Sequence, residues 1–582
     1  MNSGLQPNDS AQESGSRFGI VCDSTELKEW EARCLEHLLS LDYAQPALVM
    51  IREDCGRSGA AGIDAKRSSK RFPTRSIERL LIRCKAFQPR LLNDLCADVT
   101  IILCRASGKA TDKLLPADSD LQTIRSLDLD FILDFCAGDV GRDLCNVAKY
   151  GVWSFCHGAA KAGFTAPPFY YEMRNDENVV YAALQRLTAS DNRATILRQG
   201  WFGIVKESYC TTVDDVFFES SKWPALVLQY LRNTDSAALN APVVEVCPQG
   251  TKSPTMIDAL VIGTRMFKNF IKGKYMSLFW QEHWNIGLVS DPIHRFLDRR
   301  YSPEIRYLPG QDNRNIFRAD PFGIATDDGV TILFELFDYR VGTGVIAGIE
   351  MSDPERPTRP QVICEQPFHI SYPYLFQHRG HIYCVPETGQ ARRITLYKAG
   401  EFPSEWTKVA DLVTDMAGVD STLFRHNGTW WLFCSDADAD PNLNLFIWYS
   451  PRLTGPWRSH LGNPVKTDVR SARPAGTPFE HDGRLYRPSQ DCSGSYGGRV
   501  AINRIVTLTP TEFREEKVAI LEPNAKGPFP HGIHTLSAVG NGTLVDGMRY
   551  RFVGIVFRER LLGRFRKTMR FLANLFAQGT PS

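Results

Sequence analysis

Short hydrophobic runs alternate with polar turns along the C-terminal half of the chain. In residues 371–388, SYPYLFQHRGHIYCVPET, the apolar runs YLF and IYCV flank the polar turn HRG. Two such runs joined by a turn that ends in glycine predict a β-hairpin. Related segments lie at residues 319–338, 420–436 and 475–491, and a weaker one lies at residues 531–550. The chain therefore repeats one hairpin unit.

The repeats share an apolar anchor in their first run, and the anchors are evenly spaced. They are Phe322, Phe376, Phe424, Phe479 and Leu536. Their spacing of roughly 50 residues is the period of a four-stranded propeller blade. We therefore predict an all-β five-bladed propeller over residues 276–552. The segment HWNIGLV at residues 283–289 supplies a strand that can close the ring with a strand from its other end.

The N-terminal part has a different pattern, in which apolar runs alternate with segments of helical periodicity. The runs lie at residues 18–22, 47–51, 99–104, 129–135 and 151–158. Alternating strands and helices predict a doubly wound sheet, and the fourth run is apolar enough for a strand buried on both faces. We predict a Rossmann-like α/β domain over residues 17–211, although no GxGxxG follows its first strand.

Three further segments complete the predicted organisation. Residues 1–16 are small and polar without an apolar period, which predicts disorder. Residues 212–275 carry apolar residues at helical steps and predict a helical connector. Residues 553–582 predict a basic amphipathic helix. Its stretch 557–577 predicts either a peripheral membrane contact or docking on its own protein, and both remain open.

Charge, cysteine content and apolar runs indicate which partners and which cellular compartment to expect. The net charge of the 582 residues is +2, so no global field favours nucleic acid. The 15 cysteines form no CxxC pair, and the polar N-terminus lacks the apolar segment of a signal peptide. No apolar run reaches the roughly 18 residues of a membrane span. These features predict a cytoplasmic protein, with the membrane contact above placing it at the inner face of the membrane.

Four segments of the N-terminal part carry a family resemblance. They are DLDFILDF at 128–135, GVWSFCHG at 151–158, APPFYYEM at 166–173 and YAALQRLTASDNRATIL at 181–197. This region resembles the N-terminal domain of the formyltransferases that use 10-formyltetrahydrofolate, such as methionyl-tRNA formyltransferase and the sugar N-formyltransferases. The resemblance implies a formyltransferase fold, and 10-formyltetrahydrofolate as cofactor if the domain is active.

The family's active-site motifs fit this sequence poorly. In the strand-end motif Gly-x-x-Asn-x-His, Ser154 stands where Asn belongs, and Cys156 stands where His belongs, with His157 one place later. In the following turn, Asn192 stands where Asp belongs, with Asp191 one place earlier. A slip of one residue on a strand turns a side chain to the other face. Either His157 and Asp191 act through a shifted loop, or the domain keeps the fold without formyl transfer, and the substitutions favour the second interpretation.

Charged residues at matching positions of the hairpin repeats predict a site at the propeller axis, which the innermost strands line. The set comprises Asp320, Glu335, Glu387 and Asp420, with Tyr372, Arg473 and His534 beside them. Facing carboxylates perform glycosyl transfer when one is protonated and the other ionised. We predict Asp320 as base and Glu387 as acid, with Asp420 and Glu335 completing the catalytic set. Arg473, His534 and Tyr372 are predicted to bind substrate, and no metal is predicted.

The propeller segment carries two resemblances. Ala319-Asp320-Pro321 resembles the Asp-Pro element of the five-bladed arabinanase and xylosidase glycoside hydrolases, in which it supplies the base. The motifs RADPF, ISYPYLF, VPET, VDSTLF, SARPAG and GIHTLS resemble the N-terminal propeller of the plant glucosamine inositolphosphorylceramide transferases and their bacterial relatives. Both resemblances imply a carbohydrate or glycolipid ligand.

The sequence thus predicts a protein of glycan or glycolipid biosynthesis with a carbohydrate-type site at the propeller axis. Two alternatives stay open. The first is an active N-formyltransferase that acts on a nucleotide-linked amino sugar. The second is a non-catalytic scaffold that binds a glycan or lipid.

Overall fold

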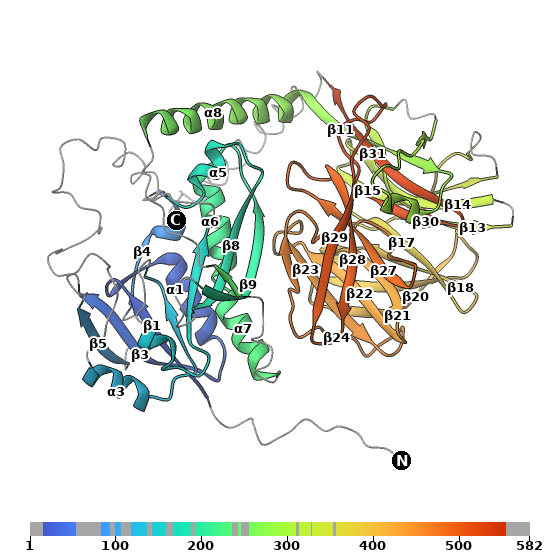
Figure 1. The fold of residues 1–582 in the computed structure, drawn as a ribbon. Coiled ribbons are helices and arrows are strands. Elements are labelled where there is room, and N and C mark those ends of the chain that lie inside the picture. The colour runs from blue at the N-terminus through green and yellow to red at the C-terminus, as the bar shows by residue number, and fades with distance from the viewer. Residues whose placement is uncertain are drawn as a thin grey trace, which may run out of the picture. The chain divides into compact units, whose positions relative to one another are not determined.

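A computed structural model gives the architecture of the chain. The residues that it describes are 15–53, 83–92, 99–105, 118–136, 142–158, 167–187, 193–234, 243–245, 255–309, 313–327, 329–352 and 357–553. The chain forms two compact units, residues 1–266 and residues 267–582, which run from blue to green and from green to red in Figure 1.

The first unit is built on a sheet that is parallel except at one side. In sheet order its strands are β5 (Thr100–Arg105), β3 (Ala44–Glu53), β1 (Ser16–Cys22), β6 (Phe131–Asp134), β7 (Val152–His157), β8 (Val179–Leu187) and β9 (Arg193–Gly203). The first five pair in parallel, and β8 and β9 are antiparallel. All four residues of β6 are buried, as expected for a strand covered on both faces. The predicted alternation of strands and helices is confirmed for this sheet.

Helices of the first unit pack through apolar stripes. They are α1 (Glu29–Leu39), α3 (Asp118–Ser126), α4 (Arg142–Cys145), α5 (Tyr170–Arg174), α6 (Tyr209–Ser220) and α7 (Trp223–Arg232). In α1 the buried Trp30, Cys34 and Leu38 recur at helical spacing. Short strands β2 (Glu26–Lys28), β4 (Pro89–Leu91) and β10 (Val243–Glu245) complete the described elements of this unit.

The predicted helical connector contains α6, α7 and a long helix, α8 (Met256–Phe279). Both α6 and α7 contact α1, so they belong to the first unit. The boundary between the units falls inside α8, between Met266 and Phe267.

The second unit is all-β and propeller-like. It contains four separate antiparallel sheets of four strands, each in sequence order except the first. The first is β12 (Arg306–Tyr307), β11 (Trp280–Val289), β31 (Gly542–Phe552) and β30 (Leu536–Val539). The second is β13 (Ile316–Thr326), β14 (Gly329–Asp338), β15 (Thr343–Met351) and β16 (Gln361–Cys364). The third is β17 (Ser371–His378), β18 (His381–Glu387), β19 (Arg393–Ala399) and β20 (Trp406–Thr414), and the fourth is β26 (Phe479–His481), β27 (Arg484–Asp491), β28 (Arg499–Leu508) and β29 (Phe513–Leu521).

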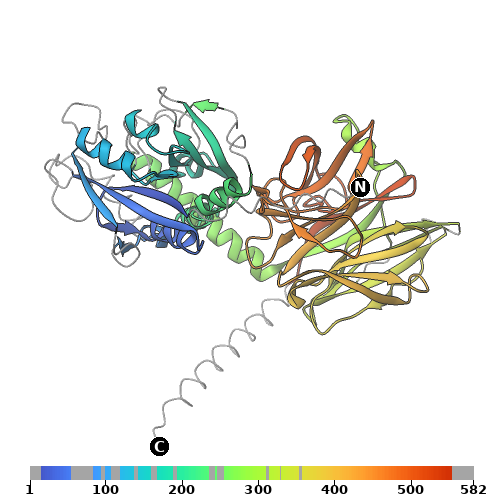
Figure 2. The same cartoon turned by 90° about the horizontal axis from the view of Figure 1, so that it is seen from below.

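The prediction of a five-bladed propeller is wrong in its number of blades, which is four. Four separate four-stranded sheets are present. The strands expected for the remaining blade are β21 (Gly418–His426), β22 (Thr429–Asp436), β23 (Asn444–Ser450) and β24 (Arg458–Ser459), and they pair in order. However, β23 also pairs with β25 (Lys466–Asp468). The four strands are thus joined to a fifth, β25, and do not form a separate four-stranded sheet. Figure 2 shows the strands of the second unit from a different side.

The first and last strands of the second unit lie side by side. Strand β11 pairs with β31 over ten residue pairs, from Trp280 opposite Phe552 to Val289 opposite Thr543. Figure 1 shows the red β31 next to the green β11. The predicted closure of the ring by a strand from its other end is confirmed.

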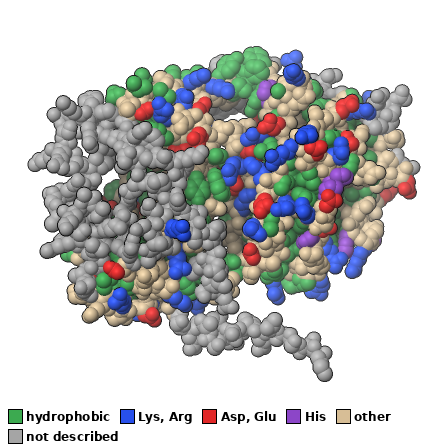
Figure 3. Space-filling view, viewed as in Figure 1, with side chains coloured by type: hydrophobic (Ala, Val, Ile, Leu, Met, Phe, Trp, Pro, Cys, Tyr) green, Lys and Arg blue, Asp and Glu red, His purple; other side chains and the backbone are tan. Residues whose placement is uncertain are grey.

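Some predictions fall outside the described residues. The predicted disordered segment is described only from residue 15, and the predicted C-terminal helix is not described beyond residue 553. Among the described residues, no helix is long and apolar enough to cross a membrane. Positive and negative side chains are interspersed on the face of the molecule in Figure 3, in keeping with the net charge of +2.

A buried ion pair links two strands of the fourth sheet, β27 and its edge strand β29. Arg487 on β27 binds Glu515 on β29 through two hydrogen bonds of 2.6 and 2.7 Å, and both side chains are at most 3% exposed. Lys466 Nζ adds a third bond of 2.6 Å to Glu515. Burial alone would raise the pKa of Glu515, but Arg487 and Lys466 outweigh it and lower this pKa below 4.5.

We expect Glu515→Gln to destabilise the fold by about 3–5 kcal/mol, because it leaves two buried cations without their counter-charge. The contribution of Glu515 is present above pH 4.5 and is lost as the pH falls through its lowered folded pKa. Urea unfolding at neutral pH measures the effect. The matched control is Glu516→Gln, since Glu516 pairs with Arg504 in an exposed ion pair that contributes at most about 1 kcal/mol. Equal effects of the two substitutions would contradict this account.

Candidate functional site

Three inner strands of the second unit carry the same backbone irregularity. In β13, β17 and β21 the pairing register shifts around Asp320, Tyr372 and Asp420. Each of these residues has a positive φ, of 52°, 42° and 50° respectively. A β-bulge redirects a backbone N–H and a side chain, and a positive φ costs a non-glycine residue about 1–3 kcal/mol. Repeated strain at equivalent positions marks this centre as a candidate site.

The bulges turn backbone N–H groups toward carboxylates of other sheets. The N–H of Asp320 donates to Asp546 Oδ2 at 3.2 Å, and the N–H of Asp420 donates to Glu387 Oε2 at 3.1 Å. Asp546 lies on β31 and Glu387 on β18. Each bulge is therefore joined to a neighbouring sheet through a carboxylate.

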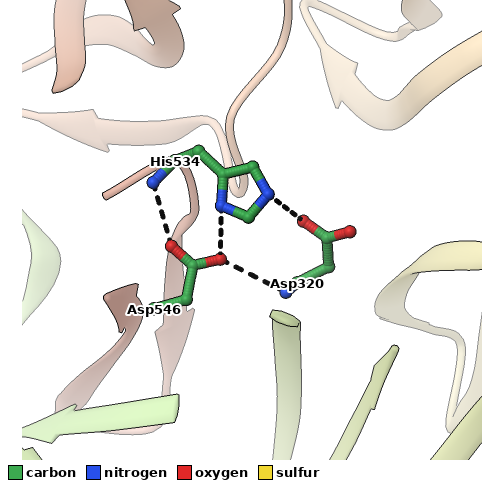
Figure 4. A group of neighbouring side chains, drawn as sticks. All are labelled: Asp320, His534 and Asp546. Atoms are coloured by element: carbon green, nitrogen blue, oxygen red, sulfur yellow. Dashed lines mark hydrogen bonds and ion pairs between the residues drawn. The ribbon is translucent and has the colours of Figure 1, made fainter. Parts of the chain in front are cut away.

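His534 lies between two carboxylates (Figure 4). Its Nδ1 is 2.6 Å from Asp546 Oδ2, and its Nε2 is 3.4 Å from Asp320 Oδ1. Burial alone would lower the pKa of His534, but Asp546 and Asp320 outweigh it and raise the pKa to about 9. Burial would likewise raise the pKa of Asp546, but His534 and backbone N–H groups hold it below its usual value. At neutral pH the group is an imidazolium paired with an ionised Asp546.

Asp420 is held by two donors from the fourth repeat. Arg473 Nε donates to Asp420 Oδ2 at 2.5 Å, and Gln490 Nε2 donates to the same oxygen at 2.9 Å. A further guanidinium nitrogen of Arg473 donates to Asn442 Oδ1 at 3.2 Å. The charge of Arg473 is thus engaged by a carboxylate inside the protein.

The pKa values of the remaining carboxyl groups of the centre are raised to different extents. Burial raises the pKa of Glu387 to about 8, with the charge of Asp420 adding to the effect. Burial also raises the pKa of Asp320 to about 6, against the opposing attraction of His534. The pKa of Glu335 is raised well above its usual value by burial and by the charges of Asp320 and Glu387. We call Asp320, Glu335, Glu387, Asp420, Arg473, His534 and Asp546 the axis cluster.

The residues of this centre differ in their exposure to solvent. Asp320, Asp420, His534 and Asp546 are each at most 5% exposed. Glu387 and Asn442 are half-buried. Tyr496 is 40% exposed, and its ring lies 5.6 Å from that of His534 and 5.0 Å from the Arg473 guanidinium. Solvent therefore approaches the cluster beside Glu387 and Tyr496.

Tyr372 lies inside the protein rather than at a binding surface. Its side chain is fully buried. Its hydroxyl lies 3.0 Å from Thr422 Oγ1 and accepts a hydrogen bond from the N–H of Gly476 at 2.7 Å. The predicted substrate contact is replaced by an internal one.

Three atoms of the cluster are spaced like metal ligands. Asp320, His534 and Asp546 each offer one ligand atom, and these atoms lie within 4.8 Å of one another. A histidine binds a metal only as the neutral imidazole. Because its two carboxylate neighbours favour the protonated form of His534, the arrangement fits an ion-paired triad better than a metal site at neutral pH.

The predicted residues of the N-terminal site are partly described. Asp191 and Asn192 lie outside the described residues. Ser154 and Cys156 lie on β7, and Cys156 is disulfide-bonded. The ring of His157 stacks on Phe217 at 3.9 Å, and burial lowers its pKa to about 3. A histidine that holds its proton so weakly, packed among aromatic rings, is unsuited to general base catalysis near neutral pH.

Several residues of the centre, among them Asp546 and Thr535, were missing from the prediction. Asp546 follows Val545, which pairs with the anchor Leu536 of the weakest repeat. Thr535 donates its hydroxyl to Asp320 Oδ1 at 2.9 Å. The signal for Asp546 was an acidic residue in an otherwise apolar second strand, as at Glu335 and Glu387.

Comparison with known proteins places the second unit near one family. Residues 310–529 match the family model for the N-terminal part of glucosamine inositolphosphorylceramide transferase 1. The chain is 36% identical over 219 residues to that transferase from Oryza sativa subsp. japonica, covering 36% of this chain and 29% of the relative. It is 36% identical over 218 residues to the Arabidopsis thaliana protein, covering 36% of this chain and 28% of the relative. The chain thus spans less than a third of these curated relatives.

Solved structures with detectable similarity include glycoside hydrolases. A family 117 glycoside hydrolase of Zobellia galactanivorans is 14% identical with a TM-score of 0.31, covering 47% of this chain and 91% of that protein. An exo-beta-1,3-galactanase of Clostridium thermocellum is 13% identical with a TM-score of 0.30, covering 38% of this chain and 56% of that protein. The resemblance of the first unit to formyltransferases receives no support from these comparisons.

We expect Asp546→Asn to lower the pKa of His534 from about 9, because burial would then act against the weaker attraction of Asp320 and Asp420 alone. The stabilisation from protonated His534 is complete below pH 6.5 and is lost as the pH rises through about 9. Titration of the imidazole signals by NMR measures both values. His460, whose pKa burial lowers to about 4, is the internal control, and an unchanged His534 titration would refute the assignment.

Proposed function

We propose that the axis cluster binds the sugar of a glycan or glycolipid and performs acid–base chemistry on its glycosidic bond. The observation that carries this proposal is the spread of proton affinities among neighbouring carboxyl groups. Asp546 stays ionised beside His534, whereas Glu387 has a pKa of about 8 and Asp320 one of about 6. Carboxyl pairs divided in this way provide an acid and a base at the same pH.

Glu387 is the proposed general acid. It carries a proton at neutral pH because its pKa is raised to about 8. It is also the partly exposed member among Asp320, Glu335, Glu387, Asp420 and Asp546, so a ligand can reach it first. In the proposed step its proton passes to the glycosidic oxygen as the bond from that oxygen to the anomeric carbon breaks.

Asp320 is the proposed base. With a pKa of about 6 it is ionised at neutral pH, and it accepts a hydrogen bond from the Thr535 hydroxyl at 2.9 Å. The acceptor, a water or a sugar hydroxyl, forms the new bond to the anomeric carbon and gives its proton to Asp320. One proton thus leaves Glu387 and one arrives at Asp320, which balances the step.

The other charged members hold the two carboxyl groups in place. Asp546 orients His534 against Asp320, and Arg473 anchors Asp420, whose N–H bonds to Glu387. We therefore assign positioning roles to Arg473 and His534 instead of direct contact with substrate. Burial raises the pKa of Glu335 well above its usual value, which favours its neutral form and limits the charge in the centre.

The type of ligand is proposed from similarity. The relatives of residues 310–529 are named as glucosamine inositolphosphorylceramide transferases. A sugar carried on a lipid is therefore the first ligand class to examine. The predicted link to glycolipid biosynthesis belongs to this proposal, and so does a cytoplasmic location at the membrane.

The test is turnover of a panel of glycans and glycolipids by the full chain, followed by mass spectrometry of released or transferred sugar. We expect Asp320→Asn and Glu387→Gln each to lower kcat/KM by about 10²–10⁴-fold. The rate should rise as the pH passes about 6, where Asp320 ionises, and fall above about 8, where Glu387 loses its proton.

The exposed Glu516→Gln is the control and should keep full activity. Turnover that survives both Asp320→Asn and Glu387→Gln would exclude the assigned roles. Sugar binding without any turnover would point instead to a non-catalytic glycan-binding unit.

A further inference from the structure

A second polar site lies on the ladder that closes the ring. His283 and Arg549 face each other across β11 and β31, and Gln281 faces Arg551 two positions along. Side chains two residues apart share one face of a strand. Beside them is an open pocket of about 500 Å³, lined by Arg314, Arg549, Tyr550, Arg551 and Phe552.

Buried polar atoms at this face lack partners. His283 is 2% exposed, and neither of its ring nitrogens has a hydrogen-bond partner among the described residues. Within the same described part, Gln281 Oε1 and Arg549 Nε are also unpartnered. Buried polar groups without partners are rare in folded proteins, and each suggests a missing ion, water or ligand.

Arginines surround the imidazole of His283. Burial, together with the charges of Arg551, Arg549 and Arg318, lowers the pKa of His283 to about 3. The nearby Glu282 accepts a hydrogen bond from Trp284 Nε1 at 3.2 Å, and strand alternation places both on the opposite face from His283. Several guanidinium groups therefore approach one another beside a neutral imidazole.

We infer that this pocket binds a phosphate group, either free or on a lipid or sugar headgroup. Guanidinium groups match phosphate in charge and geometry through paired N–H donors. Arg549, whose Nε lacks a partner among the described residues, is the lining residue placed to donate to such a group. The residues that line the pocket include no member of the axis cluster, so the proposed phosphate site does not depend on the chemistry proposed there.

The test is binding of inorganic phosphate and pyrophosphate to the full chain by calorimetry, together with sedimentation of phosphatidylcholine vesicles with and without phosphatidic acid. We expect Arg549→Gln to weaken binding at least about tenfold, because it removes charge-assisted hydrogen bonds. Arg549→Lys, which keeps the charge, should lose less. The matched control is Arg514→Gln, an exposed arginine of β29, and circular dichroism checks the fold of each variant.

Soluble phosphate binding that is lost in Arg549→Gln and kept in Arg514→Gln supports a site for free phosphate. The same pattern seen only with phosphatidic acid vesicles supports a lipid headgroup. Absence of binding to either probe, or equal binding by all variants, would overturn the inference.

A different observation concerns α8, the long helix drawn in green in Figure 1. Seven of its large apolar side chains are exposed, with Ile257, Leu260 and Phe267 each at least 67% exposed. The others are Met256, Phe270, Ile271 and Tyr275. In Figure 3 green hydrophobic surface is visible where α8 lies in Figure 1. A contiguous exposed apolar surface indicates an interaction site.

The exposed apolar residues of α8 form a stripe. Leu260, Phe267, Ile271 and Tyr275 follow one another at steps of seven, four and four residues, which keeps them on one helical face. The buried residues of α8 are Asp258 and Ile262, both near its start. The stripe therefore continues along a part of the helix whose side chains are not buried.

The charge of α8 identifies what can cover this stripe. After Asp258 the helix carries Arg265, Lys268, Lys272 and Lys274 and no acidic residue. An apolar stripe flanked by lysines lies well in the interface of an anionic membrane, where the apolar residues enter the acyl boundary and the lysines meet headgroups. We propose that α8 is a membrane-surface helix that binds anionic lipid.

The test is co-sedimentation of the full chain with vesicles of phosphatidylcholine, with and without phosphatidylserine. We expect the double substitution Phe267→Glu and Ile271→Glu to reduce binding at least about tenfold, since it places charge in the apolar boundary. The matched control is Val341→Glu, because Val341 is 72% exposed on a turn of the second unit. Lys268→Gln with Lys272→Gln should weaken binding to phosphatidylserine vesicles alone.

Binding to phosphatidylserine vesicles that the α8 variants lose and Val341→Glu keeps supports the proposal. Vesicle binding that the α8 variants do not change would overturn it. Size-exclusion chromatography covers the remaining occupant, because a dimer that the α8 variants dissociate, without vesicle binding, would assign the stripe to a second copy of the chain.

Discussion

The ladder between β11 and β31 is the constraint on which the second unit depends. Ten residue pairs join a strand near the start of this unit to its last strand. Without this pairing, β11 and β31 would each present an unpaired edge. The same ladder positions Asp546, and through it His534, against Asp320 of β13, residues more than 200 positions apart in the sequence. The pairing that closes the ring therefore also brings residues of the centre together.

A centre with several acidic groups must limit its own repulsion. Three physical devices share this task. The first is pairing of cations with carboxylates: His534 pairs with Asp546, and Arg473 pairs with Asp420. Backbone N–H groups of the bulges donate to Asp546 and Glu387. Burial favours the neutral form of the remaining groups, as the raised pKa of Glu335 indicates. Together they leave a centre with protonated and ionised carboxyl groups side by side.

The sequence predicted those features that repeat. Evenly spaced anchors such as Phe322 and Phe376 located the hairpins, and matching positions located Asp320, Asp420, Arg473 and His534, which the structure brings together. It could not predict what depends on backbone geometry. Asp546 lies in the weakest repeat, and the positive φ of Tyr372 directs its hydroxyl to Thr422 in the interior. The doubled outer edge of β23 was also missed, because pairing of short strands leaves little pattern in the residues.

The two bulges at Asp320 and Asp420 have a mechanical consequence. Their N–H groups are hydrogen-bonded to carboxylates on other sheets, and a carboxylate is a stronger acceptor when ionised than when protonated. Protonation or deprotonation of Glu387 therefore changes the strength of the hydrogen bond that it accepts from the N–H of Asp420 in β21. A change of protonation in the centre thus alters a hydrogen bond between two sheets, and the contact between these sheets depends on the protonation state of the centre.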